Sequence, residues 1–140
     1  MTKKQIMEKH QFRYTSLSKE NDDGIIYATY IPKLEINLEI AQELVQNRMT
    51  FSENRPHYIL IDFTNVKSVT KGARDYMNDP EAGLKGLLGG AFLSNSVVAT
   101  LFVNLYLKVN NPTIPAKFFT NKAEAINWLK RIKAEKTQFA

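Results

Sequence analysis

The chain has 140 residues, of which 44% are hydrophobic and 24% are charged, and its formal net charge is +5. This length is enough for one domain with a buried core, so we expect a single domain over residues 1–140. The chain contains no cysteine, which excludes disulfides and thiolate metal sites.

Basic residues gather at the two ends of the chain, within residues 3–9 and 122–136. A basic surface can bind nucleic acid, but no aromatic RNA-binding pattern or recognition helix accompanies these lysines, so we expect solvated ends and no nucleic-acid partner. Residues 1–9 lack the apolar core of a signal peptide, which favours a cytoplasmic location. We expect disorder in residues 1–9 and a tail at 134–140.

Two strands and a helix are predicted for the first third of the chain. Apolar alternation predicts strands at 12–17 and 24–30, and the turn-forming residues between them predict an antiparallel hairpin. Asn37 stands where a helix N-cap belongs, and apolar residues then recur at helical spacing as far as Thr50.

The centre of the chain is the run Tyr58–Phe63, which is apolar at every position except Asp62. A short, unbroken run of this kind predicts a strand that is covered on both faces. Asp62 then lies near the carboxyl end of the strand, where open α/β sheets usually bind ligands. A loop follows, and Thr70 is a candidate cap for a short helix that ends at Met77.

The remaining elements complete the order β-β-α-β-α-β-α-β-α. Asp79-Pro80-Glu81 predicts another helical turn. A loose connection is preferred to a phosphate-binding loop for the glycines that follow, because no Gly-Lys-Ser/Thr accompanies them. We then expect a strand at 91–93, a helix at 96–109, a strand at 115–119 and a last helix capped by Thr120 or Asn121. This order predicts an α/β fold, with a mostly parallel, mixed sheet flanked by helices.

The predicted helix at 96–109 is apolar nearly all the way round. A helix that covers a sheet normally shows water a polar side, so a second surface should cover this one. The candidates are a second subunit, a protein partner, a lipid and the neighbouring segment 70–88. A homodimer ranks first, because two-fold dimers are the commonest oligomers. No membrane span is expected, since polar residues interrupt the apolar zone at 91–107.

This element order, with the motifs below, resembles the STAS-like (SpoIIAA-like) group that is related to bacterial anti-sigma-factor antagonists, and within it the STAS/SEC14-like family of small bacterial proteins. The resemblance covers roughly residues 55–131. The residues that carry it are Ile61-Asp62, Val66, Ala73-Arg74-Asp75-Tyr76, Ser96, Asn104, Lys108, Pro115, Phe119-Thr120, Glu124-Ala125 and Trp128-Leu129.

Sporulation antagonists of that group carry Asp-Ser-Ser-Gly after the central strand, and a partner kinase phosphorylates the serine. Aligned on Val66, this chain has Thr70-Lys71-Gly72-Ala73 there, so a lysine stands at the acceptor position. The resemblance therefore implies an interaction module without that serine switch, although Ser68 and Thr70 keep hydroxyl groups close by.

We expect a partner or ligand surface made by Asp62, Ser68, Thr70, Lys71, Arg74, Ser96 and Asn104. Several of these residues also have structural interpretations. A carboxylate such as Asp62 often caps a following turn, which we favour. Arg74 could clamp an anion or pair with Asp62 or Asp75, and the sequence leaves this open. Ser96 is expected to cap its helix, and Asn104 to tie that helix to Asp62 or Arg74.

No residue set resembles a catalytic or metal site. His10 and His57 are isolated in the sequence, and we expect structural or solvent-facing roles for both. We therefore expect a non-enzymatic interaction or regulatory module without a cofactor. The alternative is a carrier or sensor of a small anionic or lipid-like ligand.

Overall fold

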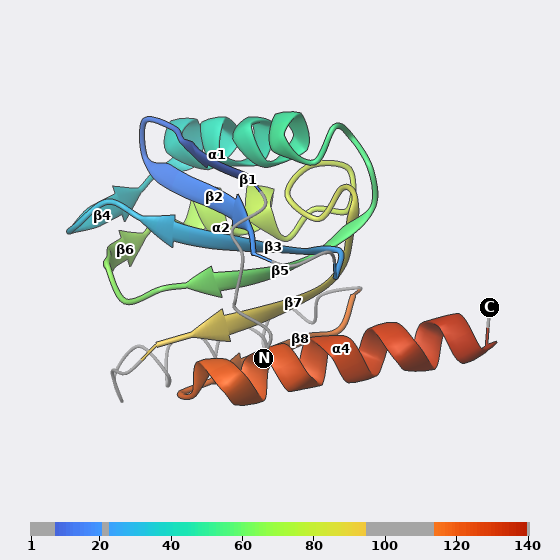
Figure 1. Ribbon diagram of the computed structural model, residues 1–140. Coiled ribbons are helices and arrows are strands. Elements are labelled where there is room, and N and C mark those ends of the chain that lie inside the picture. Colours follow the sequence, from blue (N-terminus) through green and yellow to red (C-terminus); the bar gives the residue numbers. More distant parts are fainter. Residues whose placement is uncertain (1–7, 21–22, 95–113, 140) are drawn as a thin grey trace.

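The computed structural model describes residues 8–20, 23–94 and 114–139 (Figure 1). The elements in these ranges are β1 (Glu8–Gln11), β2 (Thr15–Lys19), β3 (Ile25–Tyr30), β4 (Leu34–Ile36), α1 (Leu38–Phe51), β5 (His57–Asp62), β6 (Val66–Val69), α2 (Lys71–Met77), β7 (Leu87–Leu93), β8 (Ala116–Phe119) and α4 (Lys122–Phe139).

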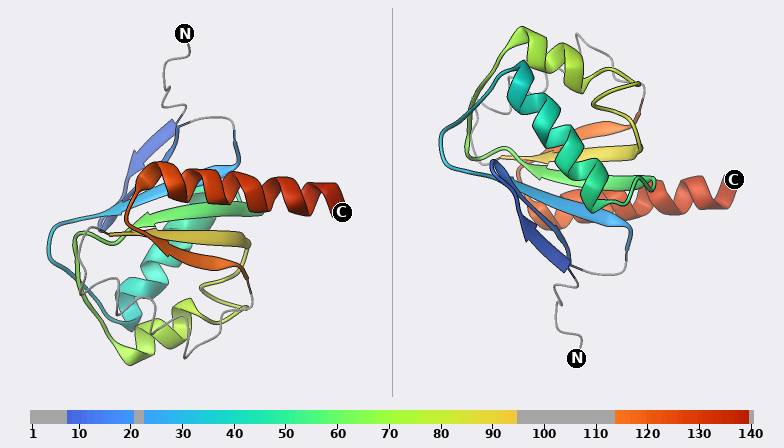
Figure 2. Two further views of the ribbon diagram at one scale, coloured as in Figure 1. Left: turned by 90° about the horizontal axis from the view of Figure 1, so that it is seen from below. Right: turned by 90° about the horizontal axis from the view of Figure 1, so that it is seen from above.

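A six-stranded sheet in the order β1-β2-β3-β5-β7-β8 forms the middle layer. β1, β2 and β3 pair antiparallel, whereas β3, β5, β7 and β8 run parallel. α1 and α2 cover one face of the sheet and α4 lies against the other, as the two views of Figure 2 show. The predicted mostly parallel, mixed sheet flanked by helices is confirmed.

β5 lies at the centre of the sheet, between two parallel neighbours. Its side chains alternate between two cores: Ile59 and Ile61 face α1, while Tyr58 and Leu60 face α4. Burying an aliphatic side chain of this size contributes roughly 1.5–3 kcal/mol to the stability of the fold. The prediction of a central strand covered on both faces is confirmed, and the apolar run has its physical reason in these two cores.

A second, two-stranded parallel sheet joins β4 to β6 at the carboxyl ends of β3 and β5 (Figure 1). We predicted neither strand, and the expected loop at 66–69 is wrong. β4 alternates apolar and polar residues, whereas β6 has two polar residues between its two valines. The apolar members Leu34, Ile36, Val66 and Val69 pack into the α1-side core. Pairing with each other satisfies their backbone groups, although each strand is too short to stand out in the sequence.

The other differences concern where elements begin and end. The first predicted strand begins at Thr15 rather than Phe12, because residues 12–14 form a turn in which the Phe12 amide donates to the Thr15 carbonyl at 2.7 Å. Residues 8 and 9, expected to be disordered, belong to β1. Residues 134–139, expected to be a tail, continue α4. The expected helix at 96–109 lies outside the described residues.

The glycine-rich connection is also more ordered than predicted. Gly89 and Gly90 are buried within β7 rather than in a loose loop. A Cβ atom at Gly89 would lie 2.8 Å from the Ile132 Cδ1 atom of α4, so glycine lets the helix pack closely on the strand. Asp79-Pro80-Glu81 forms a turn instead of a helical turn, with the Glu81 amide donating to the Asp79 Oδ1 atom at 2.8 Å.

Candidate functional site

The starts of α1 and α2 lie side by side, because each follows one strand of the small parallel sheet. Asn37 caps α1 through its Oδ1 atom, which accepts from the Ile40 amide at 2.9 Å. Thr70 caps α2 through its hydroxyl, which accepts from the Ala73 amide at 3.2 Å, and the Thr70 amide donates to the Ile36 carbonyl. Both predicted caps are confirmed.

Asp62 ends β5 and holds the turn that follows. Its Oδ1 atom accepts from the Thr64 amide at 2.9 Å, and the Phe63 amide donates to the Leu93 carbonyl of β7. The Asn65 side chain then ties this turn to β3 by donating to the Tyr30 carbonyl at 2.8 Å. The favoured interpretation, that the Asp62 carboxylate caps a turn, agrees with this bond.

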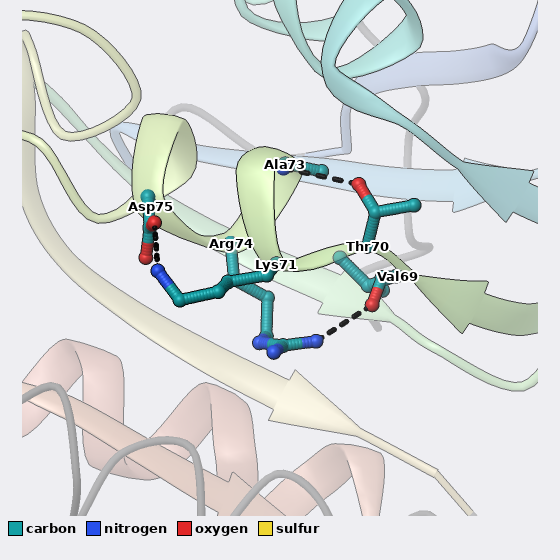
Figure 3. A network of polar contacts seen from close by, with 6 residues as sticks. All are labelled: Val69, Thr70, Lys71, Ala73, Arg74 and Asp75. Atoms are coloured by element: carbon teal, nitrogen blue, oxygen red, sulfur yellow. Dashed lines mark hydrogen bonds and ion pairs between the residues drawn. The ribbon is translucent and has the colours of Figure 1, made fainter.

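Arg74 and Lys71 occupy the first turn and a half of α2 (Figure 3). The Arg74 guanidinium donates to the Val69 carbonyl at 2.7 Å, so it holds β6 against the helix. Asp75, a candidate partner of Arg74, instead pairs with Lys71 at 2.8 Å. This Lys71–Asp75 pair is largely exposed and adds little stability, which leaves Lys71 accessible to another molecule.

Five of the seven predicted site residues belong to residues 62–74: Asp62 ends β5, Ser68 lies on β6, Thr70 caps α2, and Lys71 and Arg74 lie in α2. Ser68 is exposed on β6, opposite Glu35 of β4. Leu38, at the start of α1, is 43% exposed and belongs to the same end of the molecule. Ser96 and Asn104, the other two predicted residues, lie outside the described residues. Within the described ranges, no group of three or more His, Asp or Glu side chains could hold a metal ion.

A buried polar cluster that the sequence did not predict lies around Arg48 of α1, which is only 5% exposed. The Arg48 guanidinium donates to the carbonyls of Gly83 at 2.7 Å and Lys85 at 3.0 Å, and it lies 3.0 Å from the Nε2 atom of His57. Arg48 continues the stripe Ala41, Leu44 and Phe51 of buried positions on α1. That spacing was the signal that could have revealed it.

His57 opens β5 and is also 5% exposed, which agrees with a structural role. Burial is the largest cause that lowers the pKa of His57 to about 4; the neighbouring cations Arg48 and Lys19 also lower it, whereas the hydrogen bond to the Arg55 carbonyl raises it. Burial lowers the pKa of Arg48 to about 10 and raises the pKa of Tyr30 above its ordinary value. His57 is therefore neutral at pH 7, whereas Arg48 remains charged.

The sequence profile of the family described as "Domain of unknown function (DUF7793)" matches residues 19–133, most of the chain. The chain belongs to this family. The matched DUF7793 region takes in α1, both small strands, α2 and β5, and so the whole described part of the candidate surface. β1 and nearly all of β2 precede it. No curated protein matches the chain.

Among solved structures, the fold is similar to that of an uncharacterised protein of the DUF3478 family from Shewanella loihica PV-4, described as having a SpoIIAA-like fold. The two chains are 17% identical with a TM-score of 0.60, and the match covers 82% of this chain and 91% of the other. The DUF7793 domain therefore has a SpoIIAA-like fold, as the sequence motifs predicted. Among its described residues, no helix is long and apolar enough to cross a membrane.

Proposed function

We propose that this protein is a non-enzymatic, STAS-like interaction or regulatory module of the cytoplasm, which meets its partner through the segment from Asp62 to Arg74. The observation that carries the proposal is the self-supporting geometry of that segment. Its turn is held by Asp62, its helix start by Thr70 and its strand by Arg74. Ser68 and Lys71 are exposed on a backbone that these bonds hold in place. Because such a surface is preorganised, it loses little conformational entropy when a partner binds.

The position of Lys71 gives the surface a definite chemistry. Lys71 is the first residue of α2, and its side chain is 80% exposed. An acidic side chain of a partner can replace Asp75 in the ion pair, while the exposed Leu38 supplies an apolar contact. The hydroxyl of Ser68, which is exposed and three residues before Lys71, is available for modification, whereas the Thr70 hydroxyl already caps the helix.

A charge reversal tests this surface. Tagged wild-type protein, Lys71→Glu and Lys130→Glu would be used to capture proteins from a lysate of the source cells. Lys130 is an exposed lysine of α4 and serves as the control. A specific partner should be retained by wild type and Lys130→Glu and weakened by about tenfold in Lys71→Glu. Equal capture by all three proteins would place the partner surface elsewhere.

The proposal includes a homodimer, for which the sequence of residues 96–109 is the support. Size-exclusion chromatography with light scattering at micromolar concentration measures the mass directly. A dimer mass agrees with the proposal, and a strict monomer removes this part of it. Native mass spectrometry separates the alternative: a co-purified fatty acid, phospholipid or small anion would favour a carrier or sensor over an interaction module.

A further inference from the structure

One guanidinium connects three separate parts of the fold. Arg48 projects from α1 and donates to two carbonyls of the loop before β7, those of Gly83 and Lys85. It also contacts the ring of His57, the first residue of β5. Both side chains are 5% exposed, so water contributes little to their hydrogen bonding. Arg48 therefore ties residues 83–85 of the loop to the core, next to the backbone bond in which the His57 amide donates to the Gly86 carbonyl at 2.9 Å.

The contact between Arg48 and His57 requires a neutral imidazole. The His57 Nδ1 atom lies 2.8 Å from the Arg55 carbonyl, which can only accept, so Nδ1 carries the proton. Nε2 is then free to accept from the Arg48 Nη1 atom at 3.0 Å. A second proton on Nε2 would place two donors and two positive charges against each other. The charged side chains that act on His57 are Arg48 of α1 and Lys19 of β2, both cationic.

The loop in turn fixes the end of α2. The Gly83 amide donates to the Tyr76 carbonyl at 3.0 Å, and the Asp79 amide donates to the same carbonyl at 3.3 Å. Gly83 approaches the chain so closely that a Cβ atom there would lie 2.2 Å from the Met77 backbone. Arg48 therefore holds Gly83, and Gly83 holds the last turn of α2.

We propose that Arg48 and neutral His57 form an acid-released latch, which holds residues 78–86 and the end of α2 in place and lets them go when His57 gains a second proton. The proposal does not depend on any partner. The lowered pKa of His57, about 4, agrees with this geometry, because the surroundings disfavour the imidazolium form. The latch is closed at neutral pH and opens near the lowered pKa.

Hydrogen exchange of backbone amides tests the latch, with rates corrected for their intrinsic dependence on pH. The amides of Gly83, Leu84 and Lys85 are hydrogen-bonded in the closed loop and report on it. At pH 7 they should be protected. Below the pKa of His57 their protection should fall at least about tenfold below that of the amides of β3 and β5, which follow the stability of the whole fold.

Two variants sharpen the test. His57→Gln can still accept from Arg48 but does not titrate, so its loop should stay protected at both pH values. His10→Gln removes the exposed histidine of β1 and should behave as wild type. If His57→Gln does not fold, the wild-type protein still decides, because the loop should open with the same midpoint at which NMR shows the His57 ring to titrate. A loop that stays closed after that titration, or that opens in His57→Gln, would overturn the latch.

Discussion

At the scale of single residues, the interior contains a charged side chain, Arg48, among mostly apolar ones. Arg48 is buried, and carbonyl groups of the 83–85 loop accept hydrogen bonds from its guanidinium. A lysine could not replace it, because two nitrogens of the planar guanidinium each donate to a different carbonyl, whereas an ammonium group has only one nitrogen. The helical spacing predicts that position 48 faces inward, but the carbonyl partners lie 35 and 37 residues away and could not be foreseen.

Two glycines give opposite predictions for the same substitution. Gly83→Ala should lower the free energy of unfolding by about 2–3 kcal/mol, because the new Cβ atom would lie 2.2 Å from backbone atoms of Met77. Gly72→Ala should be neutral or raise it by about 0.5 kcal/mol, because Gly72 is exposed in α2 and its nearest neighbour would be 3.9 Å away. Urea denaturation of both variants measures the difference. Equal effects would mean that the 78–86 loop yields to the methyl group.

At the scale of elements, the structure identifies the N-cap of α4, for which the sequence offered both Thr120 and Asn121. The Asn121 side chain accepts from the Glu124 amide at 3.0 Å, and the Asn121 carbonyl accepts from the Ala125 amide. Asn121→Ala should therefore lower the free energy of unfolding by about 1 kcal/mol. Thr120→Ala, one residue earlier and exposed, should change it by less than about 0.5 kcal/mol. Thermal denaturation compares the two, and a larger loss at Thr120 would reverse the assignment.

Elements with a strong local signal were predictable and short ones were not. β5, α1 and α4 follow directly from an apolar run or from capped helical periodicity. β4 and β6 have three and four residues, and they form through parallel pairing with each other across about thirty residues of chain and through packing on the core. The same holds for the site: the Thr70 cap was visible in the sequence, whereas the bond from Arg74 to Val69 depends on β6.

At the scale of the whole molecule, the buried His57 makes stability depend on pH. Its pKa is about 4 in the folded protein and near 6.5 when unfolded, so the unfolded state binds more protons as pH falls between these values. The contribution of His57 to the free energy of unfolding is fully present above pH 6.5. Between pH 6.5 and pH 4 the free energy of unfolding falls by about 3 kcal/mol, which corresponds to this pKa shift. Urea denaturation at pH 7 and pH 4 measures the loss. His57→Gln should lose correspondingly less, and an identical loss in that variant would assign it to other groups.

The central claim of this account is that the end of the molecule around β6 and the start of α2 receives a protein partner. Photo-crosslinking in the source cells tests it most directly, with benzoylphenylalanine placed at Lys71 and, in a second variant, at Lys130 of α4. Both lysines are exposed, and they belong to helices on opposite faces of the sheet. We predict a specific cross-linked protein, or a cross-linked second copy, from position 71 and none from position 130. Cross-linking at position 130 alone would contradict the claim.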